Sequence, residues 1–124
     1  MSQRRVLIVD DEVDVCKFLE YFFENKGYET KYTTEGLKVA EIVKSYSPHV
    51  ILLDLKMPDM NGLEVLEEVR SFDKKVGVIV VTGWLDEDIG RKALKFGASD
   101  FIAKPIDLDY LENSVLAKVV SMLG

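Results

Sequence analysis

The stretch ILLDLKMPDMNG (residues 51–62) joins a short apolar run to a turn, and Asp54 stands at the junction. The apolar run of residues 50–53 is typical of a strand that is buried on both faces of a parallel sheet. Pro58, Asn61 and Gly62 are residues that turns favour, so the strand should end near Asp54. The stretch therefore predicts a buried strand that ends on a carboxylate.

The same alternation of short apolar runs with segments of helical period repeats along the chain. It predicts an α/β fold with five strand–helix (βα) units, in which helices cover both faces of a parallel sheet. A chain of 124 residues has room for one core, so we expect a single domain over residues 1–124. The polar and apolar residues of 28–33 are mixed, which favours the sheet edge for that strand. The expected strands are 5–10, 28–33, 50–54, 76–82 and 100–103, and the expected helices run from 14 to about 26, 35–45, from 62, 86–96 and 108–123.

Composition narrows the classes of function. A formal net charge of −6 gives no attraction to phosphate backbones or anionic lipid, which argues against nucleic-acid and membrane binding. The longest apolar runs are too short to span a bilayer, and no export signal is visible. Cys16 is the one cysteine, so no internal disulfide forms, and we expect a cytoplasmic protein.

Polar side chains follow four of the predicted strands. The carboxyl ends of parallel strands meet at one edge of a sheet, where ligands bind in open α/β folds. The residues at this edge are Asp10, Asp11 and Glu12, then Asp54, Thr82 and Lys104. We therefore expect a single polar site.

The residue types at this edge indicate phosphoryl chemistry. Crowded carboxylates repel one another unless a cation shares their site, and oxygen donors without His or Cys suit Mg²⁺. Lys104 and Thr82 offer donors that suit a phosphoryl group. Asp54 is the candidate nucleophile for an aspartyl phosphate, and Asp10 and Asp11 are the candidate metal ligands.

Four motifs in this order carry a resemblance to a known family: residues 9–12 (VDDE), 54–62 (DLKMPDMNG), 81–83 (VTG) and Lys104-Pro105. The chain resembles the receiver domain of bacterial two-component response regulators, over all 124 positions. The resemblance implies a flavodoxin-like, chemotaxis-receiver-like doubly wound sheet with strand order 2-1-3-4-5. It also implies a signalling switch that catalyses only its own phosphorylation and dephosphorylation.

The resemblance assigns roles to the site residues. Asp54 would accept the phosphoryl group from a histidine kinase or a His-containing phosphotransfer protein. Asp11, Asp54 and the main-chain carbonyl of Lys56 would ligate Mg²⁺, with Asp10 acting mainly through metal-bound water. Thr82 and Lys104 would contact the phosphoryl oxygens. The Lys104–Pro105 bond would be cis.

The resemblance also implies an output. Phosphorylation would draw Thr82 inward, Phe101 would follow, and the surface of the last two helices and the strand between them would change its preference for an output domain or partner. Homodimerisation on phosphorylation is compatible with this scheme. Phe101 lacks the hydroxyl of the tyrosine often found there, so its switch would work by packing alone. Lys56 and Trp84 would flank the path of hydrolytic water, and the bulk of Trp84 predicts slow self-dephosphorylation.

Other interpretations compete with this one. The acids of residues 10–12 could simply complement a helix dipole. A phosphatase of the haloacid-dehalogenase type would need a second carboxylate two residues after Asp54, where Lys56 stands. A flavodoxin-like flavin carrier would need a hydroxyl- and glycine-rich loop after the first strand, where carboxylates would repel FMN. Cys16 is expected to be a packing residue, and the lone His49 a surface residue at the amino end of a strand.

Overall fold

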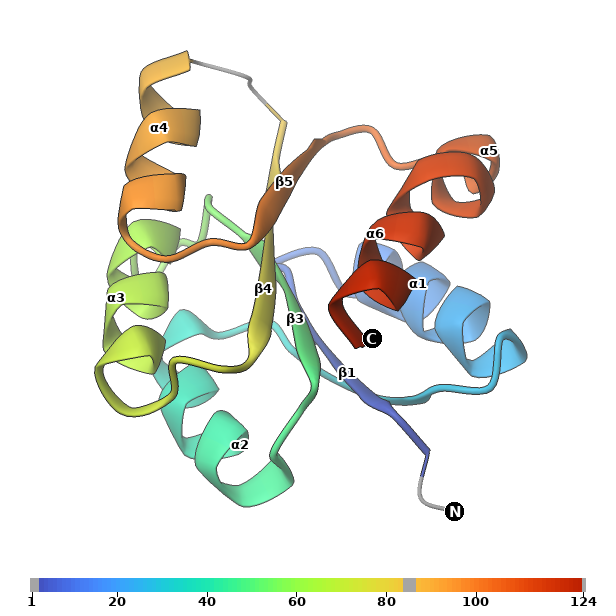
Figure 1. Cartoon of the computed structure of the whole chain (residues 1–124), viewed down its shortest axis with the longest axis horizontal. Helices are drawn as coiled ribbons and strands as arrows, with labels where there is room; N and C mark the ends of the chain where they lie inside the picture. The colour runs from blue at the N-terminus through green and yellow to red at the C-terminus, as the bar shows by residue number, and fades with distance from the viewer. Residues whose placement is uncertain (1–2, 84–86, 124) are drawn as a thin grey trace.

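The computed structural model describes residues 3–83 and 87–123, which form a five-stranded parallel sheet with helices on both faces (Figure 1). The strands lie in the order β2-β1-β3-β4-β5, and each neighbouring pair is parallel. This confirms the predicted fold class and strand order. β3 is central, so the strand that ends on Asp54 has a partner on each side.

The strands are close to their predicted positions. β2 alternates exposed and less exposed residues, as expected for an edge strand. β1 ends one residue before Asp10, and β4 begins one residue after Val76, because the sheet pairing stops there. The bounds are β1 Arg5–Val9, β2 Glu29–Thr33, β3 Val50–Asp54, β4 Gly77–Thr82 and β5 Asp100–Ala103.

The helices differ from prediction in two places. The second expected helix begins with a 3₁₀ turn, η1, and the last one is not uniform, because a π-helical stretch, η2, interrupts it. The start predicted at Asp86 lies outside the described residues. The bounds are α1 Val13–Asn25, η1 Gly36–Lys38, α2 Val39–Tyr46, α3 Gly62–Phe72, α4 Glu87–Lys95, α5 Leu108–Tyr110, η2 Leu111–Val115 and α6 Leu116–Leu123.

Two apolar layers hold the helices on the sheet. Successive strand residues face opposite sides, so Leu53 and Val80 pack with α2, α3 and α4, whereas Leu52 and Ile79 pack with α1 and the last helical segment. Figure 1 shows these helices on opposite faces of the sheet. Because both faces are covered, β3 and β4 are apolar up to their last residues, Asp54 and Thr82, so the polar side chains lie where the strands end.

The strand register brings those ends together. Val9 of β1 lies opposite Leu53 of β3. The residues that follow them, Asp10 and Asp54, therefore lie next to each other at the carboxyl ends of adjacent strands. Among the described residues, no helix is long and apolar enough to cross a membrane.

Candidate functional site

The ammonium of Lys104 joins two buried carboxylates. Its Nζ lies 2.8 Å from Asp10 Oδ2 and 3.0 Å from Asp54 Oδ2, with Glu12 Oε1 at 3.7 Å. The side chains of Asp10 and Asp54 are 3% and 5% exposed, and that of Lys104 is 19% exposed. Little water reaches these charges, so each depends on its partners for stabilisation.

Asp54 lies at the carboxyl end of the central strand. Its Oδ1 accepts a hydrogen bond from the Lys56 N–H at 3.0 Å, and Lys104 donates to its Oδ2. Burial raises the pKa of Asp54 above its usual value, and the Asp10 charge adds to the rise, although the hydrogen bonds from Lys56 and Lys104 partly oppose it. Ionised Asp54 is thus less stable here than in water.

The pKa of Lys104 moves in the direction that keeps it charged. Burial lowers the pKa of the ammonium. The hydrogen bonds to Asp10 and Asp54 raise the pKa by more than burial lowers it, so the net pKa lies above the usual value. Lys104 is therefore a permanent positive charge between the two acids.

Asp10 also belongs to a group of three acids that is partly open to solvent. Asp10, Asp11 and Glu12 offer carboxylate oxygens that all lie within 4.8 Å of one another, and of the three only Asp10 is buried. Asp10 Oδ1 accepts from the Glu12 N–H at 2.9 Å, which fixes its orientation. An all-oxygen donor set that is partly open to water is the kind that a hard divalent cation prefers. Glu12 is one of the acids that the sequence predicts at this edge, but its role is not visible in the sequence.

Thr82 and Lys104 come from neighbouring strand ends. Thr82 is 7% exposed, and its carbonyl accepts from the Lys104 N–H at 2.8 Å. The Lys104–Pro105 peptide bond is cis. These contacts place Thr82 beside the Lys104 backbone, in the same corner as Asp54.

Phe101 lies on β5, below α4. The ring is partly buried against the apolar layer that α3 and α4 cover, and a Cβ built on Gly90 of α4 would lie 3.9 Å from Phe101 Cζ. The Phe101 ring therefore lies close to α4. Trp84, the other aromatic residue singled out from the sequence, lies outside the described residues.

Two residues do not join the site. His49 is at the opposite end of the sheet, where its Nδ1 accepts from the Arg5 N–H at 2.9 Å, and burial lowers its pKa. Cys16 is fully buried in α1, and its thiol donates to the Asp10 carbonyl at 3.3 Å. Cys16 thus packs under the acidic corner.

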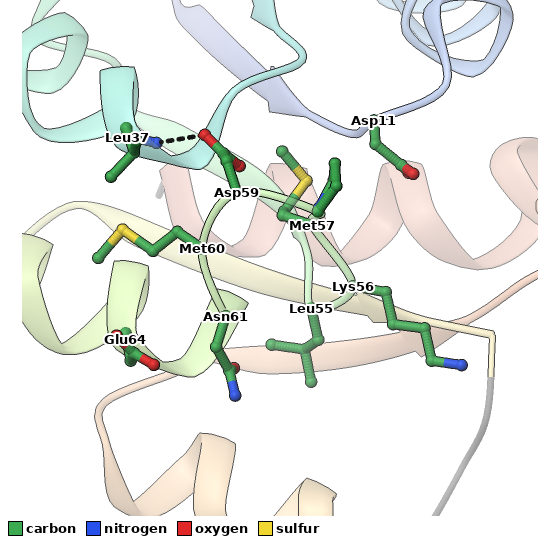
Figure 2. A pocket seen from close by; sticks show the side chains of 10 residues that line it. Asp11, Leu37, Leu55, Lys56, Met57, Asp59, Met60, Asn61 and Glu64 are labelled. Atoms are coloured by element: carbon green, nitrogen blue, oxygen red, sulfur yellow. Dashed lines mark hydrogen bonds between the residues drawn. The ribbon is translucent and has the colours of Figure 1, made fainter.

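An open pocket of about 710 Å³ adjoins the acidic group (Figure 2). Its walls are Asp11, the loop between β3 and α3, and Leu37 of η1. On this wall Asp59 accepts hydrogen bonds from two main-chain N–H groups of η1, those of Gly36 and Leu37. In the sequence Asp59 is recognisable only as part of a turn, because its partners lie 23 and 22 residues earlier in the chain.

Comparison with known proteins gives consistent results. The family model described as "Response regulator receiver domain" matches residues 6–116. Sporulation initiation phosphotransferase F of Bacillus subtilis is 33% identical over 115 residues, which are 93% of each chain. Regulatory protein AtoC of Escherichia coli is 37% identical over 107 residues, which are 86% of this chain and 23% of that protein. The chain thus spans about a quarter of the length of the second relative.

Solved structures agree with the sequence comparisons. The crystal structure of a response regulator receiver domain protein (CheY-like) from Methanospirillum hungatei superimposes with a TM-score of 0.89 at 27% identity. The match covers 98% of each chain. The similarity therefore extends over the whole sheet and the helices on both of its faces.

Proposed function

Because the chain belongs to the response regulator receiver domain family, we propose that residues 1–124 form one receiver domain that accepts a phosphoryl group on Asp54. The observation that supports this most is the placement of Asp54. It ends the central strand, and its two oxygens are held by the Lys56 N–H and the Lys104 ammonium. The carboxylate is thus oriented before a donor arrives.

The proposed reaction is an in-line transfer from a phosphohistidine. A carboxylate oxygen of Asp54 attacks phosphorus, the P–N bond breaks, and its electron pair stays on the imidazole nitrogen of the donor. Lys104 neutralises charge on the transferred group, and the Thr82 hydroxyl donates to one of its oxygens. The described residues hold no donor at this edge, since His49 lies at the other end of the sheet and its Nδ1 accepts from Arg5. The donor is then a separate protein, a histidine kinase or a His-containing phosphotransfer protein.

The proposed metal is Mg²⁺, held by Asp11, Asp54 and the main-chain carbonyl of Lys56, with Asp10 acting mainly through metal-bound water. The donor set fits, because every ligand is oxygen and the exposed side of the acidic group leaves room for water molecules and phosphoryl oxygens. Bound there, the metal would neutralise charge that Lys104 alone does not balance. In the metal-free protein, Lys104 forms an ion pair with each of Asp10 and Asp54.

The proposed output runs from Thr82 to the surface that α4, β5 and the segment from α5 to α6 present. Lys118 of α6 and Asp100 of β5 form an ion pair of 2.8 Å, which joins these two elements on this surface. The position of the Phe101 ring close to Gly90 supports the link to α4. We expect an output domain or partner protein to bind this surface, and homodimerisation through it is compatible with the same chemistry. The catalysis proposed for the chain is limited to its own phosphorylation and dephosphorylation.

Intact mass measurement tests the proposed function. Wild type is incubated with Mg²⁺ and a small phosphodonor such as acetyl phosphate, beside Asp54→Asn and Asp73→Asn. Asp73 is the matched control, since its carboxylate accepts hydrogen bonds from the Lys75 and Val76 N–H groups just before β4, away from the site. One phosphoryl group should add to wild type and Asp73→Asn and not to Asp54→Asn. An adduct on Asp54→Asn would refute the assignment, and continuous release of free phosphate without an adduct would indicate a phosphatase.

A further inference from the structure

The loop between β3 and α3, residues 55–61, is closed at its base by main-chain contacts. The Leu55 N–H donates to the Val81 carbonyl at 3.0 Å, and the Gly62 N–H donates to the Leu55 carbonyl at 3.0 Å. A Cβ on Gly62 would lie 2.4 Å from Leu55 Cα, so only glycine permits this approach. Main-chain bonds therefore hold Leu55 and Gly62 at the base of the loop, and the Asp54 side chain accepts from the Lys56 N–H beside them.

The tip of the loop is held differently, by the side chain of Asp59. Its Oδ1 and Oδ2 accept from the N–H groups of Gly36 and Leu37, each at 3.1 Å, and Figure 2 shows the bond to Leu37. A Cβ on Gly36 would lie 3.2 Å from Met60 Cβ, so the turn and the loop are in close contact. The hydrogen bonds from Leu37 and Gly36 lower the pKa of Asp59, which keeps it ionised. Asp59 thus binds η1 with both carboxylate oxygens.

The turn that Asp59 holds is itself attached to the site. The Glu35 N–H donates to Thr33 Oγ1 at 3.1 Å, and the Asp10 N–H donates to the Thr33 carbonyl at 3.3 Å. Contacts therefore run from Asp10 through β2 and η1 to Asp59. From Asp59 the loop leads back to Lys56, whose N–H binds Asp54. In this series of contacts from Asp10 to Asp54, the side chain of Asp59 joins η1 to the loop.

We propose that Asp59 is a positioning residue that anchors the loop to η1 and so holds the Lys56 backbone beside Asp54. The role rests on the proposed function in one respect, since the Lys56 carbonyl is the proposed metal ligand. Outer groups that orient metal ligands commonly change metal affinity tenfold or more when they are removed. Asp59 would act in this way, without contact to metal or phosphoryl group.

Amide hydrogen exchange of the metal-free protein, resolved by residue, tests the first half of the proposal. Asp59→Ala removes both acceptors, so exchange should speed up at Gly36 and Leu37, and also about tenfold at Lys56. Asp59→Asn keeps one acceptor oxygen and should give an intermediate rate at Lys56, and it serves if the alanine variant does not fold. Unchanged exchange at Lys56 in both variants would overturn the proposal.

Calorimetric Mg²⁺ titration tests the second half. Glu64→Ala is the matched control, because Glu64 lines the same pocket and the variant removes the same charge. Asp59→Ala should weaken Mg²⁺ binding about tenfold, and Glu64→Ala by less than about twofold, since exposed charges act weakly through solvent. Equal losses of Mg²⁺ affinity in the two variants would show that Asp59 acts only through its charge, which would overturn the positioning role. If wild type bound Mg²⁺ but acquired no phosphoryl group, the proposed function would fail. The two measurements on the Asp59 variants would still test the positioning role.

Discussion

The Lys104 ammonium donates a hydrogen bond to Asp54 at 3.0 Å, although the two residues lie at the ends of strands that are not neighbours in the sheet. The same nitrogen lies 2.8 Å from Asp10. Lys104 therefore acts as an internal counter-ion for acids that would otherwise repel each other across β1 and β3. Among the described residues, Lys104 is the ammonium that pairs with both buried acids.

Lys104→Met should destabilise the metal-free protein. Removing one partner from a buried ionic cluster leaves its carboxylates uncompensated, which costs about 3 kcal/mol. Urea unfolding at neutral pH with a chelator measures the loss, and added Mg²⁺ should restore part of the stability. Lys17→Met is the control, because this lysine is exposed on α1 and should change the free energy of unfolding by less than about 0.5 kcal/mol. Equal effects of the two substitutions would contradict a special role for Lys104.

Asp54→Asn should raise the melting temperature of the metal-free protein. Because burial raises the pKa of Asp54 in the folded state, ionised Asp54 destabilises the fold at any pH above that pKa. Removing the charge should add about 1 kcal/mol, or about 4 °C at neutral pH. The gain should shrink as the pH falls through the folded-state pKa and vanish below the unfolded-state pKa, where both states bind the proton. Calorimetry over this range measures it.

Two further variants complete the test of repulsion between the acids. Asp10→Asn should also raise the melting temperature, because it removes the other buried carboxylate that faces Lys104. Asp109→Asn, an exposed residue of α5, should change it by no more than about 2 °C. Lower melting temperatures for both Asp10→Asn and Asp54→Asn would show that pairing with Lys104 outweighs the repulsion.

The sheet and the meeting of the acids were predictable from local pattern. β3 has its predicted bounds, Val50–Asp54, because an unbroken apolar run has one stable place in a sheet that is covered on both faces. Parallel topology then brings Asp10, Asp54 and Lys104 to one edge. The sequence predicts that a metal compensates the charge of these acids, and the structure adds Lys104 as a compensating cation in its own right.

What local pattern could not predict depends on packing and on distant partners. Leu111, Val115 and Val119 recur every four residues, a spacing that an α-helix and a π-helical stretch both accept, so the η2 segment was not visible. The bonds of Asp59 to η1 join residues far apart in sequence. An aspartate in a turn has many uses, and only the folded chain shows which one applies.

Cys16 should be inert toward thiol reagents in the folded protein. Burial raises its pKa to about 12, the Asp10 charge adds to the rise, and the side chain is inaccessible. Because the thiolate is the nucleophile, labelling at pH 8 should be at least roughly a thousandfold slower than in denaturant. A chromogenic disulfide reagent measures both rates, and comparable rates would show that α1 opens often enough to expose the thiol.

Gly62→Ala should disturb the site and Gly83→Ala should not. The added methyl at Gly62 would meet Leu55 Cα at 2.4 Å, whereas at Gly83 the nearest atom is Lys104 Cβ at 3.8 Å, an ordinary contact. Backbone must move to accept the first, so Gly62→Ala should lose about 3 kcal/mol in urea unfolding. The displaced loop should also slow phosphorylation of Asp54 by acetyl phosphate. Gly83→Ala should stay within about 0.5 kcal/mol of wild type. If both variants unfolded alike, the close approach of α3 to the end of β3 would not be what orders the loop beside Asp54.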